Sequence, residues 1–323
     1  MKSANKQTKW LNYLDYFFVL RPMLFYPGWS TLLAGYLIVF KHRWALTPSE
    51  WSELDFGLLA VLFVSFALAM GGSFLLNQLA DVESDLKNNK LFLISKGHIP
   101  RKNAVVEVIV LLALSLVLAL AVDWRIFATI LIFIVITGYL YNFKPFRFKD
   151  KPWWSLWANM AMGFLAFCLG WLAVHQQFSC VLLLDALPYL LFNTALYFYT
   201  TLPDVEGDRA AGKKTLAVQF GIKTIVYVAF LFYLAGLISA VVLQDRLALI
   251  MVAPALPFFV WTLRLPEVSA TIRATKFSIL FFALAVCLKI PFYFALMAAG
   301  FYFTRWYFKA RFQFDYPNFQ GKG

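Results

Sequence analysis

The chain has 323 residues, of which 62% are hydrophobic and 14% are charged, and its formal net charge is +12. A soluble domain carries about 25% charged residues, so this composition excludes that class and predicts a protein embedded in a membrane. The three histidines and three cysteines are scattered without ligand spacing, which argues against a zinc or haem protein.

Long uncharged runs recur along the whole chain. A helix needs about 20 apolar residues to cross a hydrocarbon core, and a backbone in lipid must satisfy its own hydrogen bonds. We therefore predict an all-α, polytopic transmembrane helical bundle that forms one integral-membrane domain over residues 1–323. We expect about nine spans. The last of them is too long for one straight crossing, and a division near Lys289 and Pro291, which the sequence leaves open, would give ten. The expected spans are 14–40, 55–80, 104–122, 125–142, 153–175, 180–201, 223–243, 247–264 and 275–308.

The basic residues between these spans are distributed unevenly. Lys and Arg are concentrated in the N-terminal segment and in every second loop, and the intervening loops hold few of them. The positive-inside rule then places the N-terminus in the cytoplasm, and we expect the plasma membrane of a prokaryote. Topology accounts for the net charge, so no nucleic-acid partner is expected.

An acidic pentapeptide occurs twice. The sequence DVESD at 81–85 follows the second expected span, and DVEGD at 204–208 follows the sixth, so both face the cytoplasm. Two four-helix pseudo-repeats, at about 14–142 and 153–264, would bring the copies together around a central cavity. The central Glu83 and Glu206 point about 200° away from the preceding aspartate on a helix, so we leave them out of the predicted site.

The aspartates of the two copies have the spacing of metal ligands. Asn77, Asp81 and Asp85 lie four residues apart and share one helix face, as do Asp204 and Asp208. Oxygen ligands without His or Cys suit a hard cation such as Mg²⁺. The alternative is that both segments are solvated helix ends, but two matching copies on one side of the membrane favour a metal site.

Cations and aromatic residues alternate from Tyr141 to Lys149. Lys144, Arg147 and Lys149 are candidates for a diphosphate clamp, because Lys and Arg pair well with phosphate oxygens. The alternative is ordinary positive-inside charge among interfacial aromatics. Arg21, inside the first apolar segment, either faces an anionic site or extends its side chain to the membrane surface.

These motifs, in their order and spacing, resemble the UbiA superfamily of intramembrane prenyltransferases. The resemblance covers nearly the whole chain, including the Arg-Pro pair of the first span. It is carried by Asn77-x3-Asp81-x3-Asp85, by Tyr-x3-Pro-x-Arg-x-Lys at 141–149, and by Asp204-x3-Asp208 followed by Arg209, Gly212 and Thr215.

The resemblance implies a helical bundle that moves a prenyl group from a prenyl diphosphate to an acceptor, with Mg²⁺ as cofactor. On this basis the expected catalytic residues are Asp81, Asp204 and Lys149. Asp81 is the candidate for orienting or deprotonating the acceptor. The expected metal ligands are Asn77, Asp81, Asp85, Asp204 and Asp208. The expected substrate contacts are Asn77, Arg21, Tyr141, Lys144, Arg147, Arg209 and Lys213.

The chain departs from the family pattern at three places. Gln78 stands where many members have Asp, although Gln is a familiar variant there. Phe92-Leu93 stand where members often have a basic Arg-Pro pair, and Thr200-Thr201 stand where some branches carry Lys-Asp. These departures leave the identity of the acceptor and the exact phosphate contacts open, while the five expected metal ligands are all present.

Several functions remain open on the sequence. An intramembrane terpene cyclase would use the same ionisation without an acceptor. An ion-coupled transporter would place its carboxylates near the bilayer midplane, whereas these lie at the expected cytoplasmic boundary. For a transferase, the expected partners are the lipid bilayer, a prenyl diphosphate donor, and a hydrophobic acceptor that is either aromatic, such as a quinone precursor, or a glyceryl-phosphate lipid.

Overall fold

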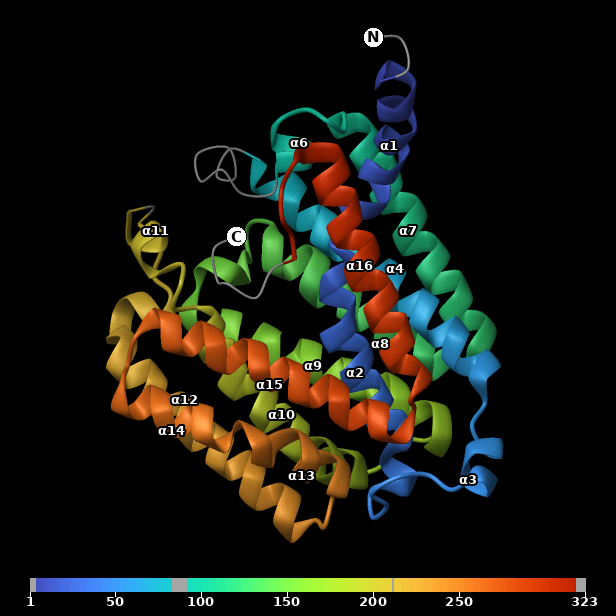
Figure 1. Cartoon of the computed structure of the whole chain (residues 1–323), viewed down its shortest axis with the longest axis vertical. Helices are drawn as coiled ribbons and strands as arrows, with labels where there is room; N and C mark the ends of the chain where they lie inside the picture. The colour runs from blue at the N-terminus through green and yellow to red at the C-terminus, as the bar shows by residue number, and fades with distance from the viewer. Residues whose placement is uncertain (1–3, 83–91, 211, 318–323) are drawn as a thin grey trace. The chain divides into compact units, whose positions relative to one another are not determined.

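A computed structural model describes residues 4–82, 92–210 and 212–317, and every regular element in these ranges is helical (Figure 1). Eight helical stretches of the described residues are long and apolar enough to cross a membrane, and a shorter one covers Trp124–Leu140. Two of the eight, Trp10–Phe40 and Arg246–Arg264, run through several of the elements below. The predicted all-α membrane bundle is thereby confirmed. The α-helices are α1 (Ala4–Phe18), α2 (Phe25–Tyr36), α3 (Pro48–Ser52), α4 (Phe56–Ala80), α6 (Phe92–Ser95), α7 (Arg101–Val122), α8 (Trp124–Ile134), α9 (Pro152–His175), α10 (Val181–Thr200), α11 (Val205–Ala210), α12 (Leu216–Val242), α13 (Arg246–Val252), α14 (Leu256–Arg264), α15 (Val268–Lys289) and α16 (Phe292–Phe312). A π-helix (Val135–Leu140) follows α8, and the short 3-10 turns are Pro22–Leu24, Leu37–Phe40, Phe148–Asp150 and Ala253–Ala255.

The long final span divides, at the position where the sequence left a division open. Helix α15 ends at Lys289 and α16 begins at Phe292, because Pro291 cannot continue the backbone ladder. The first expected span, in contrast, is interrupted. Arg21 adopts a left-handed backbone conformation with φ of 59°, which separates α1 from the turn that precedes α2.

The chain forms two compact units. The first contains residues 1–26, 60–146 and 295–323, and the second contains residues 27–59 and 147–294. The main boundary, between Phe146 and Arg147, falls between the two pseudo-repeats predicted from the sequence. The first unit also includes α16 from the end of the chain, and the pseudo-repeat itself stays a prediction.

In the first unit, α4 and α7 are joined by a reciprocal pair of serine hydrogen bonds. Ser65 Oγ donates to the carbonyl oxygen of Ser115 at 2.8 Å, and Ser115 Oγ donates to the carbonyl oxygen of Ser65 at 2.7 Å. Both serines are fully buried. Small residues allow helix backbones in membranes to approach this closely, and the paired hydroxyls fix the register of the two helices.

In the second unit, α2 and α9 meet at two glycines. A Cβ atom at Gly35 would collide with the carbonyl oxygen of Phe167, and a Cβ atom at Gly170 would collide with the carbonyl oxygen of Leu32. The obstructing atoms belong to the facing backbone and cannot rotate away. Only glycine therefore fits at either position, and the pair sets the distance between the two helices.

The second unit also encloses charged side chains. Lys41 Nζ donates to Asp185 Oδ1 at 2.8 Å, and Trp171 Nε1 donates to Asp185 Oδ2 at 3.1 Å. Lys289, which is fully buried, donates from Nζ to the carbonyl oxygen of Phe40 at 2.6 Å. A charge buried in this way is tolerated only when polar partners surround it.

Asp245 is the fourth charged side chain of this group. Its carboxylate accepts the hydroxyl of Tyr189 at 2.9 Å and the backbone N–H of Ala248 at 3.0 Å, so it also caps α13. Burial raises the pKa of the Asp245 carboxyl, and these two hydrogen bonds and the charges of Lys289 and Lys41 oppose that rise. Two lysines and two aspartates thus form a charge-balanced set, which we call the buried ion cluster: Lys41, Asp185, Asp245 and Lys289.

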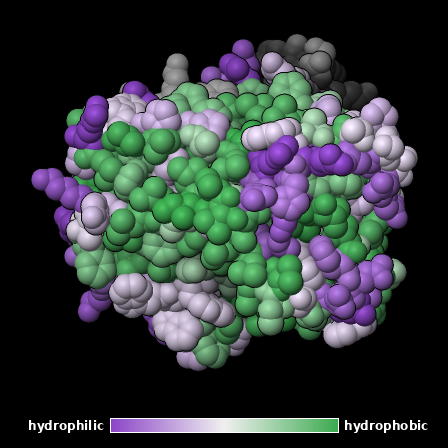
Figure 2. All heavy atoms as spheres, turned by 90° about the horizontal axis from the view of Figure 1, so that it is seen from below, coloured by the Kyte–Doolittle hydropathy of each residue, from purple (hydrophilic) through white to green (hydrophobic). Residues whose placement is uncertain are grey.

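Large hydrophobic side chains cover the outside of the long helices. On the face drawn in Figure 2, hydrophobic residues form broad areas, and polar residues gather between and around them. In α7, Val106, Ile109 and Val117 are each more than half exposed. A soluble monomer rarely exposes so much contiguous apolar surface, whereas a membrane protein presents it to lipid.

Candidate functional site

The first acidic motif begins at the end of α4. This 25-residue apolar helix ends at Ala80, and Asp81 continues its ladder because its backbone N–H donates to the carbonyl oxygen of Asn77 at 3.1 Å. Asn77 and Asp81 are both partly exposed and lie one helical turn apart. The predicted shared face is therefore present for these two residues. The third member, Asp85, lies outside the described residues.

Asn77 is held by a side chain that the sequence did not single out. Its Nδ2 donates to Oδ1 of Asn142 at 2.7 Å, and Asn142 itself is buried. Asn142 directly follows Tyr141, a predicted substrate contact that is partly exposed at the end of the π-helix. Asn142 lies within the aromatic and basic run from Tyr141 to Lys149, but nothing in that sequence indicates that it accepts a hydrogen bond from Asn77.

The last turn of α4 is also fixed to the break in the first span. Gln78 Nε2 donates to the carbonyl oxygen of Val19 at 2.7 Å. Val19 lies two residues before Arg21, whose side chain is partly exposed. Gln78, which departs from the family pattern, therefore connects the first acidic motif to the segment that contains Arg21.

The second acidic motif lies between α10 and α12. Helix α10 ends at Thr200, Asp204 is exposed, and Asp208 lies in the short helix α11 with a side chain that is 17% exposed. Asp208 forms an ion pair with Lys213 Nζ at 3.2 Å, so these two predicted site residues are brought together. Arg209, the next residue, is exposed to solvent.

The predicted basic run spans the boundary between the two units. Lys144 is exposed in the first unit, while Arg147 and Lys149 belong to the second and are partly exposed. Arg147 has a left-handed backbone, with φ of 42°, and its Nε lies 2.6 Å from Oδ2 of Asp150. One of the proposed phosphate contacts is thus already paired with a carboxylate.

The oxygen donors fit a hard divalent cation. No three His, Cys, Asp or Glu side chains gather as a metal site within the described ranges. Asn77 and Asp81 supply amide and carboxylate oxygens in the first unit, and Asp204 and Asp208 supply carboxylates in the second. Such ligands suit Mg²⁺, which keeps several waters and is usually bound by one or two carboxylates together with the phosphates of a substrate.

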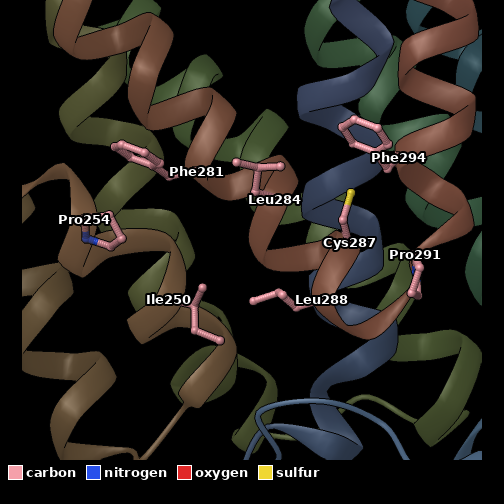
Figure 3. Close-up of a pocket in the computed structure, with 8 residues that line it drawn as sticks. All are labelled: Ile250, Pro254, Phe281, Leu284, Cys287, Leu288, Pro291 and Phe294. Atoms are coloured by element: carbon pink, nitrogen blue, oxygen red, sulfur yellow. The ribbon is translucent and has the colours of Figure 1, made fainter.

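The second unit contains an apolar groove (Figure 3). It has a volume of about 600 Å³. Its lining contains no predicted site residue and no charged side chain, so it offers apolar contact rather than chemistry. The lining residues are Ile250, Pro254, Phe281, Leu284, Cys287, Leu288, Pro291 and Phe294.

The chain is similar to proteins of known fold and name. A UbiA homologue from Archaeoglobus fulgidus, bound to GPP and Mg²⁺, superimposes with a TM-score of 0.63 and 22% identity, covering 88% of this chain and 99% of that one. The digeranylgeranylglyceryl phosphate synthase of Sulfurisphaera tokodaii is 26% identical over 178 residues, which are 55% of this chain and 63% of the relative.

The chloroplastic 2-acyl-4-prenylphloroglucinol 6-prenyltransferase of Humulus lupulus is 30% identical over 182 residues, which are 51% of this chain and 43% of the relative. The chain thus matches less than two thirds of the length of these two named relatives. The model of the UbiA prenyltransferase family matches residues 29–284, which is most of the chain. The chain belongs to the UbiA prenyltransferase family.

Proposed function

We propose that the protein transfers a prenyl group from a prenyl diphosphate to a hydrophobic acceptor at the membrane surface, with Mg²⁺ as cofactor. The observation that supports this most is that each acidic segment directly follows a long apolar helix. Asp81 follows α4, and Asp204 stands four residues after α10. An apolar chain with two such oxygen-rich segments suits a donor that has a charged diphosphate and a hydrocarbon tail.

The two acidic segments are proposed to hold the cation jointly. The ligands would be Asn77 and Asp81 from the first motif, with Asp85, and Asp204 and Asp208 from the second. Mg²⁺ would neutralise the diphosphate and so make it a better leaving group. Since the motifs belong to different compact units, their meeting is part of the proposal.

Basic side chains would bind the remaining phosphate oxygens. Lys144 and Lys149 would supply point charges from the run after the π-helix, with Tyr141 beside them. Arg147 would share its guanidinium between Asp150 and a phosphate, because five N–H donors allow more than one acceptor. Lys213 already lies beside Asp208, so a cation bound there would leave Lys213 available to the diphosphate; Arg209 and Arg21 are the remaining candidates.

Within this proposal Asp81 has a second task. A partly exposed carboxylate next to the cleaved bond can orient the acceptor or remove its proton. Asp204 is assigned to the same catalytic group because it occupies the matching position of the second motif, and Lys149 would stabilise charge on the departing diphosphate.

The acceptor is proposed to be a glyceryl-phosphate lipid or an aromatic compound. One of the relatives described above is named for digeranylgeranylglyceryl phosphate synthesis, and the other for prenylation of an acylphloroglucinol. We further propose that the acidic motifs face the cytoplasm of a prokaryotic cell, as the distribution of basic residues predicts.

Purified protein with labelled geranylgeranyl diphosphate and Mg²⁺ tests the proposal, with geranylgeranylglyceryl phosphate and hydroxybenzoate as alternative acceptors. We expect acceptor-dependent release of diphosphate that is lost in Asp81→Ala and in Asp204→Ala. Glu206→Gln is the matched control, because Glu206 is an exposed carboxylate in the same segment and is predicted to remain active. Full activity of both aspartate variants would refute the site, and release of a hydrocarbon without an acceptor would indicate a cyclase.

A further inference from the structure

Asn142 uses both hydrogens of its side-chain amide on the π-helix that precedes it. Its Nδ2 donates to the carbonyl oxygens of Thr137 and Gly138, each at 2.9 Å. The side chain is only 3% exposed, so Asn142 is packed inside the first unit.

The π-helix explains why these two carbonyls need a side-chain donor. The N–H of Tyr141 bonds back five residues to Ile136, whereas the N–H of Phe143 bonds back four residues to Tyr139. Two carbonyls, those of Thr137 and Gly138, therefore lie between these acceptors, but only one backbone N–H lies between the two donors. The π-helix leaves at least one buried carbonyl without a backbone partner, and the amide of Asn142 satisfies it.

These bonds determine which way the amide of Asn142 faces. A backbone carbonyl can only accept, so the nitrogen of Asn142 must point toward the π-helix and its Oδ1 must point toward Asn77. Asn77 then has to donate with its own Nδ2, as the 2.7 Å contact shows. The remaining atom, Asn77 Oδ1, is turned away from Asn142 and accepts no hydrogen bond within the described part of the chain.

We propose that Asn142 is a positioning residue that presents Oδ1 of Asn77, rather than its amide hydrogens, to the divalent cation of the prenyl diphosphate. The inference rests on the proposed function, because it assumes that Asn77 is a ligand. If Asn77 were rotated by 180° about its amide, two hydrogens carrying partial positive charge would face the cation. Residues that orient a ligand in this way typically account for a 10–100-fold change in metal affinity.

Binding of Mn²⁺, followed by electron paramagnetic resonance in the presence of a non-hydrolysable prenyl diphosphate, tests the proposal without measuring activity. Asn142→Leu removes the acceptor that holds Asn77 and is expected to weaken Mn²⁺ binding by about 10–100-fold. Ser73→Ala is the matched control. Ser73 is buried one turn before Asn77, and it accepts a hydrogen bond from Thr137 of the same π-helix at 2.9 Å. Its loss removes a contact between the same two elements and should leave Mn²⁺ affinity unchanged.

Two further variants separate orientation from stability. Asn77→Asp makes both side-chain atoms oxygens, so the double variant Asn77→Asp/Asn142→Leu needs no orienting partner and should regain Mn²⁺ affinity. Asn142→Asp keeps an acceptor for Asn77 but loses the donors to the π-helix. It should therefore lower the apparent melting temperature without weakening Mn²⁺ binding.

The outcomes distinguish this inference from the proposed function. If the unmodified protein binds no Mn²⁺ with the diphosphate analogue, both are overturned. If it binds Mn²⁺ and Asn142→Leu binds it equally well, only the positioning role of Asn142 is overturned. That role is also overturned if Asn77→Asp/Asn142→Leu stays weak, or if Asn142→Asp binds as poorly as Asn142→Leu. Should Asn142→Leu not fold, Asn142→Asp decides the question, because weaker Mn²⁺ binding than that of the unmodified protein would overturn the positioning role.

Discussion

Replacing Gly170 by alanine should force α2 and α9 apart. A Cβ atom at this position would stand 2.5 Å from the backbone nitrogen of Tyr36 and 3.0 Å from the carbonyl carbon of Leu32, whereas ordinary contact begins at 3.4 Å. The helices must therefore separate locally by at least 0.9 Å, the difference between 3.4 and 2.5 Å, and the carbonyl oxygen of Leu32, which lies closer still, requires more. Such overpacking costs about 3 kcal/mol at its upper end, because backbone atoms cannot rotate away. Alanine recovers about 1 kcal/mol in helix propensity, so the net loss is about 2 kcal/mol.

Thermal unfolding in detergent, followed by the fluorescence of the 11 tryptophans, measures this loss. At a fixed scan rate we expect the apparent melting temperature of Gly170→Ala to fall by about 4–8 °C. Gly163→Ala is the matched control in the same helix, since its Cβ meets nothing closer than Asn193 Nδ2 at 3.4 Å. A Gly170→Ala protein that melts with the unmodified protein would refute the close approach of α2 and α9.

Two other predictions concern charged groups. Lys289→Met leaves two buried aspartates with one lysine and should destabilise the protein by about 3 kcal/mol. Adding Asp245→Asn to Lys289→Met should restore part of this loss, because it balances the buried charge again. Thermal unfolding of both variants measures the two effects. The hydrogen bond from the backbone N–H of Thr47 is the main cause that lowers the pKa of the Glu50 carboxyl from 4.5. The stabilisation of α3 by Glu50 is therefore complete above pH 4.5, and it is lost as the pH falls through the lowered pKa. Hydrogen exchange in α3, corrected for intrinsic rates, should therefore accelerate at low pH in the unmodified protein and lose this dependence in Glu50→Gln.

Apolar length and proline account for most of what the sequence predicted of the fold. Uninterrupted hydrophobic runs determine helices wherever the solvent is lipid, and Pro291 determines the end of α15 because it lacks an N–H. The break at Arg21 was not predicted, because nothing in the composition indicates that an arginine adopts a left-handed backbone conformation. The apolar residues that follow it also continue the hydrophobic pattern of a single span. The π-helix was missed for a similar reason, because one residue of altered hydrogen bonding leaves the hydropathy unchanged.

The candidate site, like the fold, was predicted only in part from the sequence. Aspartates at four-residue spacing predict a shared helix face, and Asn77 and Asp81 are found one turn apart as expected. The hydrogen bond that Asn77 donates to Asn142 was not predictable. Asn142 is held in place by the carbonyl oxygens of Thr137 and Gly138, and these are available to its amide because of the π-helix. The ion pair between Asp208 and Lys213 could have been suggested by opposite charges five residues apart, but only the turn after α11 brings them together.

The buried ion cluster has a consequence for the order in which the chain assembles in the membrane. A Lys or Asp near the centre of a single inserted helix costs about 2.5–3.5 kcal/mol, and less toward the ends. The partners are distant, since Lys289 donates to a carbonyl 249 positions earlier in the sequence. Until α15 has been synthesised, the buried ion cluster contains Lys41 and two aspartates, so it carries one uncompensated negative charge. A truncated chain that stops before Lys289 is therefore expected to leave that charge unbalanced inside the second unit and to insert less stably than the full chain.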